Sequence, residues 1–288
     1  MTIQTITICG AGTMGHGIAQ VCAQHGFKVR LYDIQEEYVQ RGKNNIVKNL
    51  DKGIERGKVT LESKENCLQN LICTTDLHIA CKDTDLVIEA IPEKLDLKHE
   101  LFQKIESLVS PTCILGTNTS SISITKIAAV LKNQDRLLGM HFFNPVHIME
   151  LLELVVAEKT SVQTLDLIKE FSLKINKISI TVKDVPGFAT SRLGVALGME
   201  AIRMVQDGVA RPEDIDTAMV LGYRHPVGPL KLTDMVGLDV RMNIGTYLAK
   251  ELNNPAFEPP QLMKDMVSEG KLGKKSGQGF YSWNKSST

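Results

Sequence analysis

The sequence lacks an excess of charge of either sign. Lysine plus arginine and aspartate plus glutamate each number 33 in 288 residues, so the formal net charge is zero. A nucleic-acid partner needs a basic surface that neutralises phosphates, and this composition offers no surplus for one. The sequence also lacks an apolar run long enough to cross a bilayer. We therefore expect neither a nucleic-acid nor a membrane partner.

Closely spaced cysteine pairs are missing as well. None of the six cysteines forms a C-x-x-C pair or has the spacing of a zinc site. Cys9 and Cys22 fall on apolar positions of predicted elements, where a thiol behaves as a small hydrophobe. The first residues enter a strand-like segment without a charged leader or a cleavage signal. These features predict a reduced, metal-free and cytoplasmic protein.

Strand-like and helix-like stretches alternate over the first two thirds of the chain, which is typical of a mostly parallel sheet covered by helices. Apart from Glu89, segments 86–90 and 113–115 are apolar, as expected of strands buried on both faces. Helical spacing of apolar residues predicts a helix between these two segments. The predicted strands are Thr5–Cys9, Lys28–Tyr32, Leu86–Ala90, Cys113–Thr117, Leu137–Phe143, Leu151–Val156 and Ser179–Val182.

A change of pattern near residue 185 predicts a domain boundary. The charged stretch 36–65 looks helical and is too long for a simple crossover, so we expect a helical insertion that projects from the first domain. Strand signals stop at Pro186-Gly187. We therefore expect an α/β domain at residues 1–185 and a smaller all-α domain at residues 186–288. The helices predicted in the second domain are Phe188–Val205, Pro212–Gly222, Pro229–Leu252 and Pro260–Glu269.

Residues 10–15 match G-x-G-x-x-G directly after a strand and at the start of a helix. In this arrangement Gly10 makes a tight turn, Gly12 lets the backbone approach a pyrophosphate, and Gly15 lets the helix pack closely on the strand. The helix N-terminus presents N–H groups to the anion. The motif predicts a Rossmann-like cofactor site that includes Gly10, Ala11, Gly12, Thr13, Met14 and Gly15.

The strand after this helix ends in Asp33, about 20 residues further on, where a carboxylate hydrogen-bonds the ribose hydroxyls of the cofactor. No arginine directly follows Asp33 to accept a 2′-phosphate. NAD is therefore favoured over NADP, although a neighbouring loop could still supply a phosphate contact.

The candidate catalytic segment is 139–145, which reads Gly-Met-His-Phe-Phe-Asn-Pro at the carboxyl end of a predicted strand. Open α/β sheets bind their ligands at this edge. His141 can act there as a general base if a second group fixes its tautomer. Glu150 and Glu153 on the next predicted strand differ by an odd number of residues and point to opposite faces, so only one of them can serve.

These motifs together resemble those of a known family. His-Phe-Phe-Asn-Pro, with Glu153 twelve residues after His141, is similar to the core signature of the 3-hydroxyacyl-CoA dehydrogenases. Three further motifs follow the family's order: Asn118–Ser121, Pro186–Phe188 and Gly273–Tyr281. The resemblance spans essentially the whole chain and favours the short bacterial 3-hydroxybutyryl-CoA dehydrogenase type.

The resemblance implies reversible, NAD-dependent oxidation of a short-chain (S)-3-hydroxyacyl-CoA to the 3-ketoacyl-CoA. It makes His141 the general base and Glu153 the carboxylate that orients it. It places Ser120 at the substrate oxygen and the cofactor, and Asn144 beside the nicotinamide. It also implies that the all-α domain closes the substrate cleft and carries a homodimer interface. Further matched positions are Glu93 and Lys98 for the cofactor, and Asn49 and Arg56 in the helical insertion for coenzyme A.

Plainer interpretations of the same residues stay open. Composition and spacing do not prefer His141 to His147 or His225, and a histidine at a strand end is often structural. Ser120 is also placed to cap a helix. The two insertion residues matched to coenzyme A also fit a solvated helix face.

Ser191 departs from the family, which usually has an asparagine before the arginine that follows. Serine keeps a hydrogen-bonding group at this substrate-binding position but has a shorter reach, so substrate preference can differ. One alternative function is the oxidation of a free hydroxy acid, as in the related branch that resembles gulonate dehydrogenase and lambda-crystallin. The other is a non-catalytic NAD-binding protein, which requires a lost His–Glu pair, and both residues are present.

Overall fold

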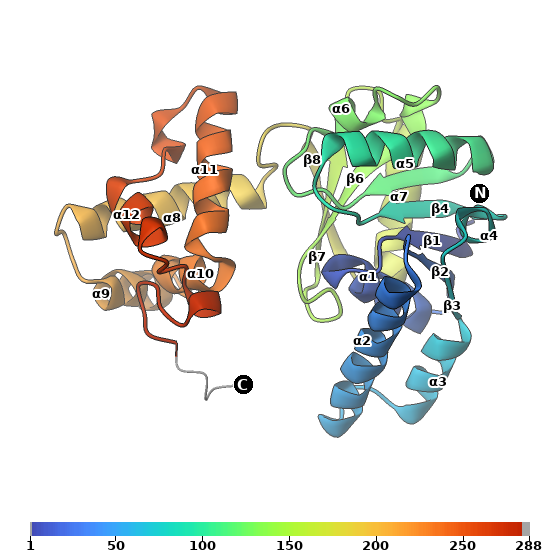
Figure 1. Ribbon diagram of the computed structural model, residues 1–288, viewed down its shortest axis with the longest axis horizontal. Coiled ribbons are helices and arrows are strands. Elements are labelled where there is room, and N and C mark those ends of the chain that lie inside the picture. The colour runs from blue at the N-terminus through green and yellow to red at the C-terminus, as the bar shows by residue number, and fades with distance from the viewer. Residues whose placement is uncertain (1, 284–288) are drawn as a thin grey trace. The chain divides into compact units, whose positions relative to one another are not determined.

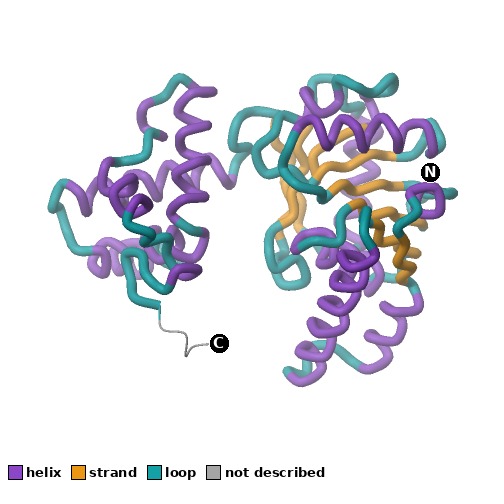
Figure 2. The backbone as a smooth tube through the Cα atoms, viewed as in Figure 1, coloured by secondary structure: helices purple, strands orange, loops and turns teal. Residues whose placement is uncertain are grey.

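The computed structural model describes residues 2–283. The chain forms two compact units, one ending at Val185 and the other beginning at Pro186. Helices cover a sheet in the first unit, whereas the second is built of helices and loops (Figures 1 and 2). The predicted fold class, a mostly parallel α/β domain followed by a helical one, is confirmed.

Eight strands of the described chain form one sheet in the order β3-β2-β1-β4-β5-β6-β7-β8. Strands β1 to β6 run parallel, whereas β7 pairs antiparallel with β6 and parallel with β8. Strand order reverses between β1 and β4, and open α/β sheets bind ligands at such a switch point. The strands are β1 (Thr5–Cys9), β2 (Lys28–Tyr32), β3 (Leu71–Thr74), β4 (Leu86–Glu89), β5 (Ile114–Thr117), β6 (Leu137–Phe142), β7 (Leu151–Val156) and β8 (Ile178–Lys183).

Burial explains which strands were predictable. Strands β4, β5 and β6 are buried along their whole length, as their apolar sequences predicted. Strand β3 was not predicted; its four residues, Leu71–Thr74, lie at the sheet edge and none of them is fully buried.

The helical insertion is two helices rather than the single stretch 36–65. Helix α2 (Glu36–Glu55) stops before Gly57, whose φ of 65° leaves the helical region, and α3 (Leu61–Gln69) starts after the N-cap Thr60. The two helices lie side by side and project beyond the sheet (Figure 1). The other helices of this unit are α1 (Thr13–Gln24), α4 (Leu77–Cys81), α5 (Leu95–Leu108), α6 (Ile124–Ala128) and α7 (Val162–Lys174).

One predicted helix of the second unit is also divided. The stretch 229–252 breaks at Gly237, whose φ of 105° ends α10 (Pro229–Val236) and precedes α11 (Leu238–Leu252). The predicted helix at 212–222 begins as α9 (Pro212–Thr217) and continues as a π-helical turn, Ala218–Gly222. The remaining α-helices of this unit are α8 (Thr190–Gln206) and α12 (Gln261–Ser268).

The motif at 273–281 is anchored inside the second unit by buried Asp234. The Asp234 carboxylate accepts the N–H groups of Phe280 and Tyr281, each at 2.9 Å, and the indole N–H of Trp283 at 2.8 Å. A Cβ on Gly279 would lie 2.1 Å from this carboxylate, so the glycine allows the approach. The motif therefore has a packing role within its own unit.

The glycine motif between β1 and α1 makes two close backbone approaches. Gly10 has a φ of 107°, and a Cβ there would lie 2.5 Å from the carbonyl oxygen of Ala90. A Cβ on Gly15 would lie 1.7 Å from the carbonyl oxygen of Gly10, so helix α1 packs directly on the turn. At Gly12, by contrast, an added Cβ meets no atom within 4 Å. Two of these glycines thus serve the fold, while Gly12 leaves open space above the turn.

This contrast predicts different behaviour for two alanine variants. Gly15→Ala should lower the free energy of unfolding by about 1–3 kcal/mol through overpacking. Gly12→Ala should change it by no more than about 0.5 kcal/mol, yet weaken dinucleotide binding because the methyl group occupies the space left for the pyrophosphate. Urea denaturation and NADH titration measure the two effects. Equal destabilisation of both variants would contradict the assignment.

Candidate active site

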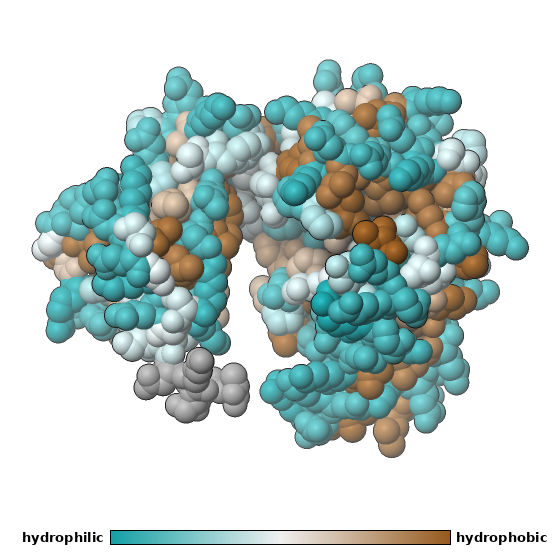
Figure 3. Space-filling model, viewed as in Figure 1, coloured by the Kyte–Doolittle hydropathy of each residue, from teal (hydrophilic) through white to brown (hydrophobic). Residues whose placement is uncertain are grey.

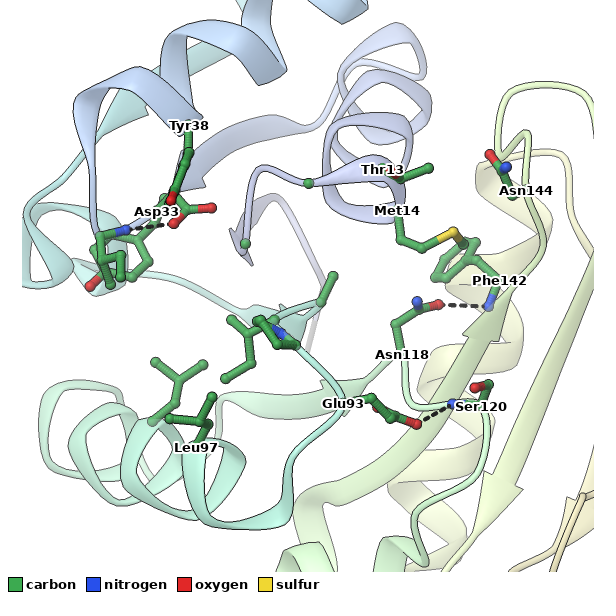
Figure 4. Close-up of a pocket in the computed structure, with 18 of the residues that line it drawn as sticks. Thr13, Met14, Asp33, Tyr38, Glu93, Leu97, Asn118, Ser120, Phe142 and Asn144 are labelled. Carbon is green, nitrogen blue, oxygen red and sulfur yellow. Dashed lines mark hydrogen bonds between the residues drawn. The ribbon is translucent and has the colours of Figure 1, made fainter. Parts of the chain in front are cut away.

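A cavity of about 960 Å³ opens at the carboxyl ends of strands β1, β2, β4, β5 and β6, and all of its lining residues belong to the first unit. Much of the wall is apolar, and Figure 3 shows brown surface gathered between the regions of α5 and α2. In Figure 4, Asp33 and Tyr38 lie at one end, and Ser120, Phe142 and Asn144 lie at the other. Because different side chains lie at its two ends, the cavity fits a long ligand whose two ends differ chemically.

The glycine turn fits the pyrophosphate of a dinucleotide. Gly12 is the N-cap of α1, and no side chain accepts the first N–H groups of that helix. These N–H groups are therefore available to an anion at a helix N-terminus. Of the six predicted turn residues, Gly10, Gly12, Thr13 and Met14 line the cavity. The other two lie behind it: Ala11, whose N–H is engaged by Asp33, and Gly15, which packs on Gly10.

Asp33 organises the end of the cavity where the ribose is expected. Its Oδ2 accepts the N–H of Ala11 at 2.7 Å and its Oδ1 accepts the N–H of Ile34 at 2.8 Å. Tyr38 and Arg41 of α2 also line this end, with the guanidinium carbon of Arg41 5.0 Å from the centre of the Tyr38 ring. Sequence reasoning did not single out these two residues, because their role depends on the face that α2 turns to the cavity.

His141 and Glu153 form the ion-pair geometry expected of a general base and its orienting group. Nδ1 of His141 lies 2.7 Å from Oε2 of Glu153. The two residues stand directly opposite each other in the antiparallel pairing of β6 and β7. Glu153 is fully buried, while His141 contributes to the cavity wall beside the ring of Phe143. Nδ1 is thus the nitrogen that the carboxylate engages.

The competing residues do not share this arrangement. Glu150 lies before β7 and is exposed, so it is not the partner of His141. His147 follows in the β6–β7 loop outside the cavity lining, where partial desolvation and the nearby His16 and Lys177 side chains lower its pKa. His225 belongs to the second unit. The geometry therefore favours His141 among the candidates.

Ser120 lies in the cavity wall and does not cap α6. Its backbone N–H donates to Oε1 of Glu93 at 3.0 Å (Figure 4). The N-cap of α6 is Ser123, whose hydroxyl accepts the N–H of Lys126. The capping interpretation of Ser120 is therefore wrong, because the helix starts three residues later than that interpretation requires.

Glu93 receives several donors from the loop that carries Ser120. Besides the Ser120 N–H, its Oε1 accepts the hydroxyl of Thr119 at 2.6 Å and the N–H and hydroxyl of Ser121 at 3.2 and 3.1 Å. Burial opposes ionisation of Glu93, but Lys98 and these hydrogen bonds outweigh it and hold the pKa of the carboxyl below its usual value. An ionised Glu93 thus fixes the loop.

Lys98 lies beneath the cavity rather than in its lining. Its side chain is 1% exposed and pairs with Glu89 at 2.7 Å and with Glu93 at 3.1 Å. A contact between Lys98 and the cofactor, as implied by the family resemblance, is therefore not seen in the cavity wall, because both carboxylates hold the ammonium group below the surface.

Two asparagines define the end of the cavity near His141. Asn144, which precedes a cis peptide bond to Pro145, lines the wall as predicted from the motif's position. Asn118 also lines it, and its Oδ1 accepts the N–H of Phe142 at 2.9 Å. Asn118 links the end of β5 to β6, the strand of His141, and its position in the Asn-Thr-Ser-Ser motif was the only sequence signal for it.

Three predicted substrate contacts lie elsewhere. Asn49 donates to Oε1 of Gln20 at 3.1 Å and does not line the cavity. Arg56 is the C-cap of α2, also outside the lining. Ser191 lies in the first turn of α8, in the second unit. The cavity of the first unit thus brings most of the predicted cofactor residues together with His141, Ser120 and Asn144, but not these three.

Residues 2–283 contain no group of three or more His, Cys, Asp or Glu side chains placed to hold a metal ion. No helix within the described part of the chain has the length and apolar character to cross a membrane.

Comparison with known proteins agrees with this geometry. Residues 5–185 match the model of the 3-hydroxyacyl-CoA dehydrogenase NAD binding domain, and residues 187–283 match that of the family's C-terminal domain. A probable 3-hydroxybutyryl-CoA dehydrogenase of Deinococcus radiodurans is 43% identical over 96% of this chain and 99% of its own. A 3-hydroxybutyryl-CoA dehydrogenase of Mycobacterium tuberculosis is 42% identical over 98% of this chain and 99% of its own.

The fold of a solved relative is also closely similar. The crystal structure of an (S)-3-hydroxybutyryl-CoA dehydrogenase from Ralstonia eutropha has a TM-score of 0.95 and 43% identity, and the match covers 99% of this chain and 100% of that one. Both halves of the chain thus match one family, in sequence and in fold. The chain belongs to the 3-hydroxyacyl-CoA dehydrogenase family and is an NAD-dependent oxidoreductase.

Proposed function

We propose that this protein reversibly oxidises short-chain (S)-3-hydroxyacyl-CoA, such as 3-hydroxybutyryl-CoA, to 3-ketoacyl-CoA. The observation that carries the proposal is the 2.7 Å contact between buried Glu153 and His141, which lies in the wall of the cavity that begins at the glycine turn. Relatives of nearly the same length are named for the same substrate.

His141 removes the proton from the C3 hydroxyl of the substrate through Nε2. Glu153 holds the ring through Nδ1 and stabilises the imidazolium that forms, as a carboxylate does for a histidine base. Bound NAD supplies the hydride-accepting chemistry. In the reverse direction the imidazolium of His141 donates its proton to the C3 oxygen of the ketone.

The remaining residues bind and orient the reactants. The first N–H groups of α1 hold the pyrophosphate, and Asp33 accepts hydrogen bonds from the adenosine ribose. Ser120 contacts the substrate oxygen near His141, and Asn144 contacts the nicotinamide end of the cofactor. Ser191 is assigned to substrate binding by the family resemblance alone. Contacts with coenzyme A are assigned by resemblance alone to Asn49 and Arg56. To make its contact, Asn49 would have to give up its hydrogen bond to Gln20.

The first test is NADH oxidation at 340 nm with acetoacetyl-CoA, run beside NADPH and beside free acetoacetate. We expect rapid turnover with NADH and the thioester. Activity on the free acid but not on the thioester would instead support the free-hydroxy-acid branch. Tight NADH binding without turnover on any acyl-CoA would support a non-catalytic protein.

The role of His141 predicts a separation of binding from turnover. His141→Gln should bind NADH almost as wild type does, while kcat with acetoacetyl-CoA falls by about 10²–10⁴-fold, the usual contribution of a general base. His147→Gln is the matched control, since His147 lies outside the cavity lining, and its kcat should stay close to that of wild type. Near-normal turnover of His141→Gln would remove His141 as the base.

We further propose that the protein is a homodimer through its helical unit. The family resemblance supports this proposal, and the unit exposes several large apolar side chains that a partner could bury. They are Leu193, Val209, Leu221, Tyr223, Met235, Val236 and Val240. Light scattering coupled to gel filtration at low micromolar concentration should give a mass near twice the 31.8 kDa of the chain. A mass of one chain would contradict the dimer.

A further inference from the structure

Three charged side chains form a network under one end of the cavity, which we call the Lys98 cluster: Lys98, Glu89 and Glu93. The ammonium of Lys98 donates to both oxygens of Glu89, at 2.7 and 2.9 Å, and pairs with Glu93 at 3.1 Å. Lys98 is 1% exposed and Glu89 is fully buried, whereas Glu93 is partly exposed at the cavity wall.

Each carboxylate oxygen of Glu89 accepts two hydrogen bonds. Besides Lys98, its Oε1 accepts the N–H of Ile91 at 2.8 Å and its Oε2 accepts the hydroxyl of Thr117 at 2.6 Å. These bonds tie the end of β4 to the end of β5, beneath the loop that carries Ser120. Glu89 itself does not line the cavity, so it acts on a ligand only through its charge or through its neighbours.

The cluster carries an uncompensated negative charge. Two carboxylates share one ammonium group, so the sum of minus two and plus one is minus one. The hydrogen bonds and the ammonium that lower the pKa of Glu93 keep that carboxylate ionised. Buried charges are screened less than exposed ones, so this charge acts on ligands in the neighbouring cavity.

The charge lies at the end of the cavity opposite Asp33. Glu93 accepts the N–H of Ser120, and Ser120 shares that end of the wall with Asn118, Phe142 and Asn144 (Figure 4). In the proposed function, this end receives the nicotinamide and the ribose of adenosine lies at Asp33. The following inference rests on that orientation of the cofactor.

We propose that the Lys98 cluster sets the relative affinity of the enzyme for NAD⁺ and NADH. Glu89 does not touch the cofactor in this proposal and acts through the negative charge that it adds to the cluster. The nicotinamide ring of NAD⁺ carries one positive charge that NADH lacks. A fixed negative charge beside the ring therefore favours the oxidised cofactor. The pyrophosphate and adenosine are the same in both forms, so the ratio of the two Kd values isolates the ring.

The test compares Glu89→Gln with Thr117→Val. The first variant keeps the volume and removes one negative charge from the cluster. The second removes a hydrogen bond to the same carboxylate and changes no charge. For Glu89→Gln we expect the ratio of Kd for NAD⁺ to Kd for NADH to rise on the order of tenfold, as one nearby charge produces at intermediate dielectric. For Thr117→Val the ratio should stay within about twofold.

Titration of protein fluorescence or calorimetry gives both Kd values without any substrate. A ratio unchanged in Glu89→Gln would overturn the proposal, because it would show that the charge does not act on the nicotinamide ring. A ratio that moves equally in Thr117→Val would overturn it as well, because it would describe a loosened site rather than a lost charge. If Glu89→Gln does not fold, Glu93→Gln removes the same charge from the wall, and an unchanged ratio there would overturn it equally. A protein that binds both cofactors but does not turn over acyl-CoA would disprove the proposed substrate and leave the ratio measurable.

Discussion

His141 and Glu153 meet only because strand β7 runs back along β6. In the antiparallel pair the two residues stand directly opposite each other, so their side chains share one face of the sheet. A slip of one residue would send Glu153 to the other face and break the pair. The register is fixed on both flanks, since β6 also pairs with β5 and β7 with β8. The contact that orients the proposed base is thus held by the ladder of the sheet rather than by a loop.

Carboxylates that accept backbone N–H groups shape the loops around this pair. Glu93 holds the loop of Ser120, and Asp184 accepts the N–H groups of Ile124 and Thr125 at the start of α6. In the helical unit Asp234 fixes the last described residues in the same way. Hydrogen bonds to a charged acceptor are about twice as strong as neutral ones. Loops that lack regular structure therefore still present their side chains in defined positions.

The features that could be predicted from the sequence are those that depend on a single residue or on a short local pattern. Buried strands such as β4 show as apolar runs, and the glycine motif shows as spacing. The alternation of side chains along a strand narrowed the choice to Glu150 or Glu153 but could not decide it, because register depends on the partner strand. The burial of Lys98 was not predictable for a related reason: a charged residue on a helix is normally exposed, and its burial follows from two carboxylates contributed by β4 and the loop after it. Breaks at Gly57 and Gly237 were missed because glycine is also tolerated inside helices.

Asp33 also constrains how the cofactor preference of this enzyme can be engineered. Its two carboxylate oxygens hold the N–H of Ala11 in the glycine turn and the N–H of Ile34 ahead of α2. With Asp33 in its proposed place at the ribose, residue exchanges that remove the carboxylate to admit a 2′-phosphate would also leave one or both of these backbone donors without their acceptor and loosen the glycine turn. A change of preference from NAD to NADP must therefore remove the negative charge of Asp33 and also supply a new acceptor for these two N–H groups. That requires a redesign of the turn rather than a single substitution.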